Sequence, residues 1–162
     1  MQLSPFARRL GLFVHVVLSV GWLGAVLAYL ALAVTGLATR DAQLVRSSYL
    51  TMEIVGWYVI VPLALGALLS GLVQSLGTSW GLLQHYWVVV KLALTVISSV
   101  ILLLHMPTVS RVAAEAAAMT LPIADPGTVA VQLVVHAAGG LLVLGVITAL
   151  SVFKPWGRTP WA

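Results

Sequence analysis

The sequence predicts an all-α fold: a polytopic membrane protein built as an antiparallel four-helix transmembrane bundle, in one domain covering residues 1–162. The first observation is composition, since 61% of the residues are hydrophobic and 7% are charged, against about 45–50% and about 25% in a soluble globular domain. The second is a mean hydropathy of +1.10. The third is the presence of four apolar stretches, each at least the ~20 residues that cross a ~30 Å hydrocarbon core. Together they exclude a soluble enzyme domain.

The first two spans are expected at about residues 6–38 and 43–76. Ser4 followed by Pro5 is typical of a helix start, with a capping hydroxyl and a proline at the first helical position. The first apolar run is about twice as long as the 7–15-residue core of a signal peptide, so we expect a retained span. Asp41 follows a short turn and is expected to cap the second helix.

The last two spans are expected at about residues 84–106 and 128–153. A short turn at 77–79 connects the third span to the second. Pro107 is expected to end or kink the third helix, because proline lacks a backbone N–H and its ring clashes with the preceding turn. The turn sequence at 125–127, Asp-Pro-Gly, precedes the fourth span.

The charged residues are interpreted as signals of membrane orientation. The 8 basic and 4 acidic residues are too few and too scattered for a phosphate-binding patch, which excludes a nucleic-acid partner. The end of the bundle that carries both termini has four basic residues and no acidic one: Arg8, Arg9, Lys154 and Arg158. The opposite loops mix both signs: Arg40, Arg46 and Arg111 with Asp41, Glu115 and Asp125. Since basic loops favour the cytoplasm, we expect a plasma-membrane protein with both termini cytoplasmic.

The lack of cysteine narrows the chemistry of any cofactor site. It excludes disulfides, thiolate zinc sites, Cys-ligated iron–sulfur clusters, covalently attached c-type haem and a Cys nucleophile. A metal or cofactor must therefore be held by His, Lys, Met, Tyr or carboxylate side chains.

Five ionisable side chains are expected at membrane depth, where such groups are costly and usually face a bundle interior. Folding adjacent helices at their hairpins, with ~1.5 Å rise per residue, places them in two layers. The inner layer, nearer the termini, holds His15 and Lys91, and the outer layer holds Glu53, His105 and His136. His85 stands beside Tyr86 and Trp87 and is expected to be an interfacial anchor instead.

The outer layer indicates haem b. Two imidazoles from different helices at one depth are the basic requirement for bis-His ligation, and helix bundles commonly build cofactor sites this way. We therefore expect His105 and His136 as axial ligands. Glycines 139–140 leave the next turn bare for a flat macrocycle, and Arg46 and Arg111 are candidates to neutralise propionates. A second haem b in the inner layer would involve His15 and Lys91.

Other interpretations of these side chains stay open. His105 and His136 could hydrogen-bond across helices in a cofactor-free transport or structural protein. They could also join Glu53 in a divalent-metal site, or relay protons. Lys91 could extend to the interface, being one turn beyond Trp87, or act as an ion-pair partner, a propionate contact or an axial amine.

A family resemblance enters at the same residues. Segment 13–24, with His15, Trp22 and Gly24, resembles the first helix of two related membrane families, the CopD-type copper-resistance proteins and the HemJ-type protoporphyrinogen oxidases. The segment 86–92, with Lys91, followed by His105, is similar to the HemJ third helix. Over nearly its whole length the chain most resembles an actinobacterial branch of four-helix membrane proteins related to these.

The resemblance implies functions of two kinds. The HemJ likeness implies haem b, with the positions of His15 and Lys91 in its binding, and protoporphyrinogen oxidation as an activity. The CopD likeness implies copper passage, although the four Met residues form no ladder suited to Cu(I). The function we predict is a haem b membrane protein that exchanges electrons with a lipid-soluble partner such as quinone. Enzymatic oxidoreductase activity and homo-oligomerisation are left open.

Overall fold

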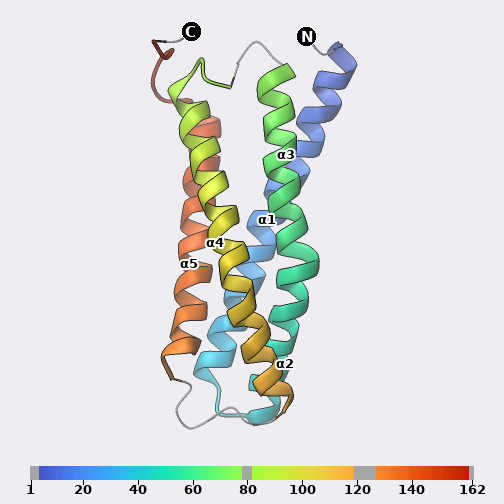
Figure 1. Cartoon of the computed structure of the whole chain (residues 1–162), viewed down its shortest axis with the longest axis vertical. Helices are drawn as coiled ribbons and strands as arrows, with labels where there is room; N and C mark the ends of the chain where they lie inside the picture. Colours follow the sequence, from blue (N-terminus) through green and yellow to red (C-terminus); the bar gives the residue numbers. More distant parts are fainter. Residues whose placement is uncertain (1–3, 78–81, 119–126, 161–162) are drawn as a thin grey trace.

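The fold is a bundle of long helices. The computed structural model describes residues 4–77, 82–118 and 127–160. Its helices are α1 (Pro5–Ala38), α2 (Ala42–Val55), the π-helix η1 (Gly56–Ile60), α3 (Val61–Gly77), α4 (Tyr86–Ala117) and α5 (Gly127–Phe153). Since α2, η1 and α3 form one continuous rod, the described residues contain four helical rods, each long and apolar enough to cross a membrane (Figure 1). The predicted all-α four-helix transmembrane bundle is confirmed.

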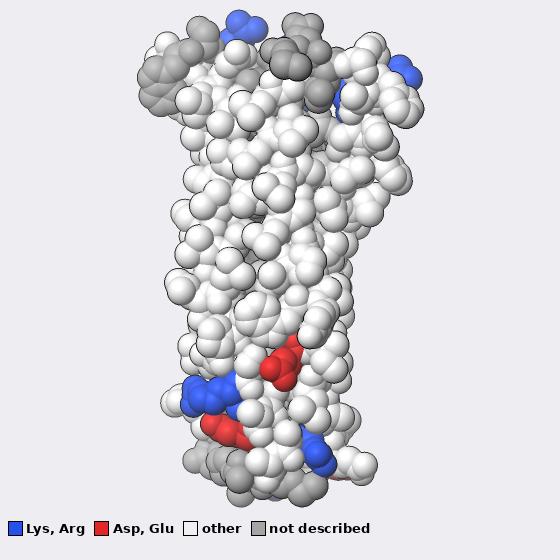
Figure 2. Space-filling model, turned by 45° about the vertical axis from the view of Figure 1, so that its right-hand side comes forward, with Lys and Arg blue, Asp and Glu red and all other residues white. Residues whose placement is uncertain are grey.

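The rods form a closed ring in which chain neighbours lie side by side. Helix α1 packs against the α2–α3 rod and against α5, and α4 packs against the same rod and against α5. Both ends of the chain lie at one end of the bundle (Figure 1). Charged side chains are seen near the two ends of the face shown in Figure 2, with a broad uncharged band between them. This pattern is the one a lipid bilayer requires.

The two predicted helix caps are confirmed. The Ser4 hydroxyl accepts a hydrogen bond from the Ala7 amide at 3.2 Å, and Pro5 stands at the first helical position. Asp41 Oδ1 accepts from the amides of Gln43 at 2.8 Å and Leu44 at 3.2 Å. Each cap satisfies amides that the first turn of a helix leaves without a backbone partner. The predicted turns at 78–79 and 125–126 lie outside the described residues.

The expected end of the third span near residue 106 is wrong. Helix α4 continues through Pro107 to Ala117. A row of apolar side chains beyond the proline is buried in the bundle: Val109, Val112, Ala113 and Ala116. Their packing favours a continuous helix, and proline is tolerated in transmembrane helices because neighbouring groups compensate for the lost hydrogen bond.

The π-helix in the second rod was not predicted. Its wide turn is closed by the Val61 amide, which donates to the Gly56 carbonyl. A Cβ at Gly56 would lie 2.6 Å from Met106 Cε and 3.8 Å from Tyr29 Cε2. The absence of a side chain at Gly56 therefore lets the fully buried Met106 of α4 pack directly against the π-turn. Such π-turns often occur at functional sites, and this one contacts the residue beside His105.

Candidate functional site: a histidine pair between two helices

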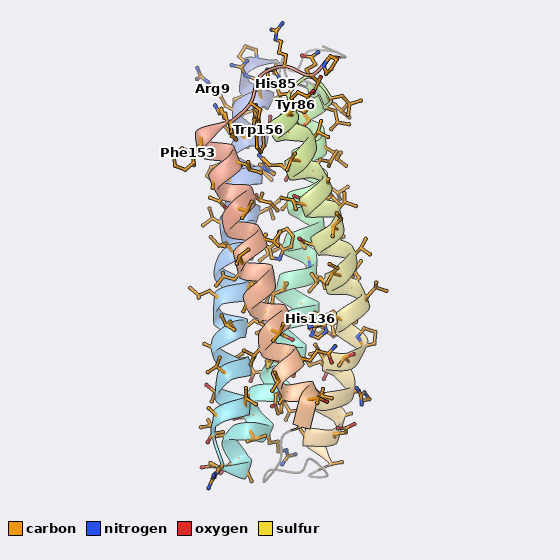
Figure 3. All side chains as sticks on the ribbon, turned by 90° about the vertical axis from the view of Figure 1, so that its left-hand side faces the viewer. Arg9, His85, Tyr86, His136, Phe153 and Trp156 are labelled. Carbon is orange, nitrogen blue, oxygen red and sulfur yellow. The ribbon has the colours of Figure 1, made fainter. Side chains whose placement is uncertain are left out.

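The structure brings His105 of α4 and His136 of α5 together. Their rings are stacked, with centroids 4.0 Å apart and planes at 6°. Figure 3 labels His136 on α5, well inside the length of the bundle. The prediction that these two imidazoles share one depth is confirmed, and it holds because α4 runs on past Pro107 and α5 packs beside it. Their role as ligands stays a prediction.

The hydrogen bonds of the pair determine which nitrogen of His136 carries a proton. His136 Nδ1 lies 2.9 Å from the Gln132 carbonyl oxygen. A carbonyl only accepts, so Nδ1 carries the hydrogen and donates it. In the neutral imidazole, Nε2 then keeps a lone pair that is available to a ligand.

His105 contributes a buried nitrogen that no described residue satisfies. The residue is 9% exposed, and its Nε2 is fully buried with no hydrogen-bond partner in the described structure. An unsatisfied buried polar group is costly, and in a native protein such a group calls for an explanation, such as a bound ligand. The site therefore offers one unsatisfied and one available ring nitrogen side by side.

This donor set fits haem b, but the present packing of the rings does not admit it. Bis-His ligation requires the two imidazoles on opposite faces of the macrocycle, whereas these rings lie face to face at 4.0 Å. Ligation therefore requires α4 and α5 to separate locally and the rings to turn. The neighbouring turn of α5 is bare, as expected, since a Cβ at Gly139 would meet no heavy atom within 4 Å and one at Gly140 would meet only Val26 Cγ1 at 3.8 Å.

Glu53 is the third member of the predicted outer layer and was predicted with His105 and His136 as a divalent-metal ligand. It is half-buried on α2. Within residues 4–77, 82–118 and 127–160, no three His, Asp or Glu side chains gather closely enough to hold a metal ion. The structure thus unites two of the three residues proposed for a divalent metal.

The two arginines proposed for propionates are placed differently from one another. Arg111 is six residues beyond His105 and hence about 120° away around α4. Its side chain is 59% exposed and forms an ion pair with Glu115, Nη1 to Oε1, at 3.8 Å. Arg46 is half-buried on α2, and its Nε is buried without a hydrogen-bond partner among the described residues. Arg46 is therefore the better placed of the two to reach an anionic group inside the bundle.

The inner layer contains one imidazole and one amine. The Ser70 hydroxyl donates its only proton to the Gly66 carbonyl at 2.7 Å, so it accepts the hydrogen of His15 Nδ1 at 3.0 Å. Lys91 lies close enough to His15 for its charge to act on the ring. Its Nζ is 5.3 Å from the centroid of Trp87, which stands one turn nearer the start of α4. The ammonium thus points toward the end with the termini, which favours the interfacial interpretation of Lys91.

His85 lies at that same end, as expected for an interfacial anchor. It precedes α4, and its ring centroid is 6.1 Å from that of Trp87. Figure 3 shows His85 and Tyr86 at the end of the bundle, far from His136. His85 is therefore a suitable control residue for experiments on the pair.

Tyr29 is a polar group that sequence reasoning did not select. It is 6% exposed, and its hydroxyl is buried without a hydrogen-bond partner in the described structure. It packs beside Gly56, which also contacts Met106. The signal was present in the sequence, since Tyr29 follows His15 and Trp22 at spacings of seven on one face of α1.

Comparison with known proteins leaves the function to be argued from the site. No family model, curated protein or solved structure matches this chain.

Proposed function

We propose that this protein binds haem b non-covalently through His105 and His136 and exchanges electrons with a lipid-soluble partner such as quinone. The observation that carries the proposal is the buried Nε2 of His105, which has no hydrogen-bond partner among the described residues, on a ring next to that of His136. The Nδ1–H of His136 already donates to the Gln132 carbonyl, so the lone pair of His136 Nε2 is available to bind iron. Two neutral ring nitrogens in an apolar bundle are the donors that haem b requires.

The side chains have distinct tasks in this proposal. Bound haem would supply a one-electron iron couple. The Gln132 carbonyl fixes the tautomer and orientation of His136. The burial of His105 excludes water from the site. His136 is only half-buried, so a partner dissolved in the bilayer can approach the pair from the side.

The test is an optical spectrum of the purified protein, oxidised and then reduced with dithionite. After expression with ample haem we expect a Soret band that shifts on reduction, with about one b-type haem per chain. A His85→Ala variant should give the same spectrum, because His85 lies at the end of the bundle. A well-folded but colourless protein would overturn the proposal.

A cofactor-free helix contact is the second candidate. The face-to-face stacking at 4.0 Å favours it, because the rings already satisfy one another's packing. Two fully buried side chains also pack near the pair: Met106, which follows His105, and Leu133, which lies one turn before His136. In this case the same preparation would be colourless, and elemental analysis would find no bound metal.

The proposal includes a plasma-membrane location with both termini in the cytoplasm. Its support is the basic, acid-free end of the bundle described above. Because the chain lacks cysteine, single cysteines report topology cleanly. Gln43→Cys should react with a membrane-impermeant thiol reagent in intact cells, whereas Gln84→Cys should react only after lysis. The reverse pattern would show the opposite orientation.

A further inference from the structure

The end of the bundle that carries the termini collects positive charge from several elements. Its basic residues are Arg8 and Arg9 of α1, Lys91 of α4, and Lys154 and Arg158 after α5. None of the described residues at this end is acidic. On the face shown in Figure 2 this end carries only Lys and Arg, whereas the opposite end carries both signs. A positive end of this kind is suited to an anionic partner at the membrane surface.

Lys91 and Lys154 both lie toward the end of the bundle that carries the termini. Lys91 points toward this end, with its Nζ over Trp87 at 5.3 Å. Lys154, directly after α5, adds a second positive charge that acts on Lys91 from a different element. Like charges repel more strongly near a membrane than in water, because the local dielectric is low. An anion lying between the ammonium groups would offset this repulsion.

The C-terminal segment is held against the start of α4. The Thr159 amide donates to the Gln84 carbonyl at 3.0 Å, and the Thr159 hydroxyl donates to the Leu83 carbonyl. His85 and Arg158 form an antiparallel backbone bridge. These contacts hold Arg158 beside the start of α4, at the end toward which Lys91 points.

Strain within this segment also indicates a defined conformation. Lys154 and Trp156 have φ angles of 46° and 65°, in a region that residues other than glycine seldom adopt. Such conformations persist only where surrounding contacts impose them, and they cluster at ligand sites. Trp156 and Phe153 are 62% and 79% exposed, and Figure 3 shows both at this end. Exposed aromatic rings at this level are typical of the membrane interface.

We propose that this end of the bundle binds the phosphate headgroup of an anionic phospholipid, with Lys91 and Lys154 contacting the phosphate and Trp156 and Phe153 lying against the lipid. Basic sites at the ends of transmembrane helices bind such headgroups. The flanking aromatic side chains favour a lipid over free phosphate, because they would contact its glycerol and acyl region. The proposal does not depend on haem.

The test measures thermal unfolding of the purified full chain in neutral detergent. Phosphatidylglycerol should raise Tm by about 5 °C, whereas phosphatidylcholine and inorganic phosphate at equal concentration should not. Lys91→Gln should remove most of the rise, and Lys91→Arg should keep it. Arg40→Gln, which removes one charge at the opposite end, should leave it unchanged.

Native mass spectrometry provides a second measurement that does not rely on stability. With equimolar phosphatidylglycerol and phosphatidylcholine, the wild type and Arg40→Gln should retain phosphatidylglycerol, and Lys154→Gln should retain at least threefold less, roughly the loss of one close charge contact. Equal retention of the two lipids, or full retention by both lysine variants, would overturn the proposal. Equal protection by inorganic phosphate would overturn its lipid part.

Discussion

Replacing His105 with alanine is expected to lower the haem content of the purified protein by roughly tenfold or more, since even the loss of groups that only orient a metal ligand costs about 10–100-fold. The substitution removes the buried Nε2 that has no hydrogen-bond partner in the part of the chain that the structure describes. Only His136 would then remain to hold the haem, and a haem held by one imidazole would give a high-spin spectrum. The measurement is haem per chain by pyridine haemochrome, together with the Soret position.

Two matched variants help to interpret that result. His136→Ala should lose haem to a similar extent, because both rings are needed. His85→Ala should retain it, since that ring lies against Trp87 at the interface. Helix content by circular dichroism should be equal in all of them, which separates ligand loss from unfolding. If His105→Ala keeps the wild-type spectrum, the pair is not the ligand set, whatever else binds haem.

The fold could be predicted from the sequence because its causes are local. Apolar runs of sufficient length and the caps at Ser4 and Asp41 depend only on neighbouring residues. The continuation through Pro107 and the π-turn at Gly56 could not be predicted this way. Both depend on packing between α4 and the second rod, where Met106 fills the space that a side chain at position 56 would take.

The position of the candidate site along the bundle could be predicted, but the orientation of its side chains could not. Folding the helices at their hairpins, with a nearly constant rise per residue, placed His136 opposite a range of positions that includes His105, and the structure brings the two rings together. Whether their rings stack or diverge depends on side-chain torsions and on the separation of α4 from α5, which no sequence pattern encodes. The outward direction of Arg111 was available from helical phase, since six residues turn the chain away from His105. The direction of Lys91 was not, because a long flexible side chain can lie either way along its helix.

The bundle core gives the largest expected effect on stability. Leu133 of α5 is 0% exposed and lies one turn before His136, whereas Leu142 on the same helix is 68% exposed. Leu133→Ala should lower the free energy of unfolding by about 2–3 kcal/mol, near the lower end of buried Leu→Ala changes. The lower end applies because lipid is as apolar as the core, so the loss comes from the cavity and the missing contacts rather than from transfer to water.

Leu142→Ala is the matched control for this change. Both substitutions alter helix propensity equally, and both residues lie within α5, so their difference isolates packing inside the bundle. We expect the Leu142→Ala variant to unfold within about 0.5 kcal/mol of the wild type, as substitutions away from packed sites usually do. The comparison is made by titrating mixed micelles with sodium dodecyl sulfate and following helix content. Equal destabilisation by the two variants would mean that the buried and exposed sides of α5 are not those seen here. Because Leu133 and His136 lie on adjoining turns of one face of α5, the placement of His136 beside His105 would then be wrong as well.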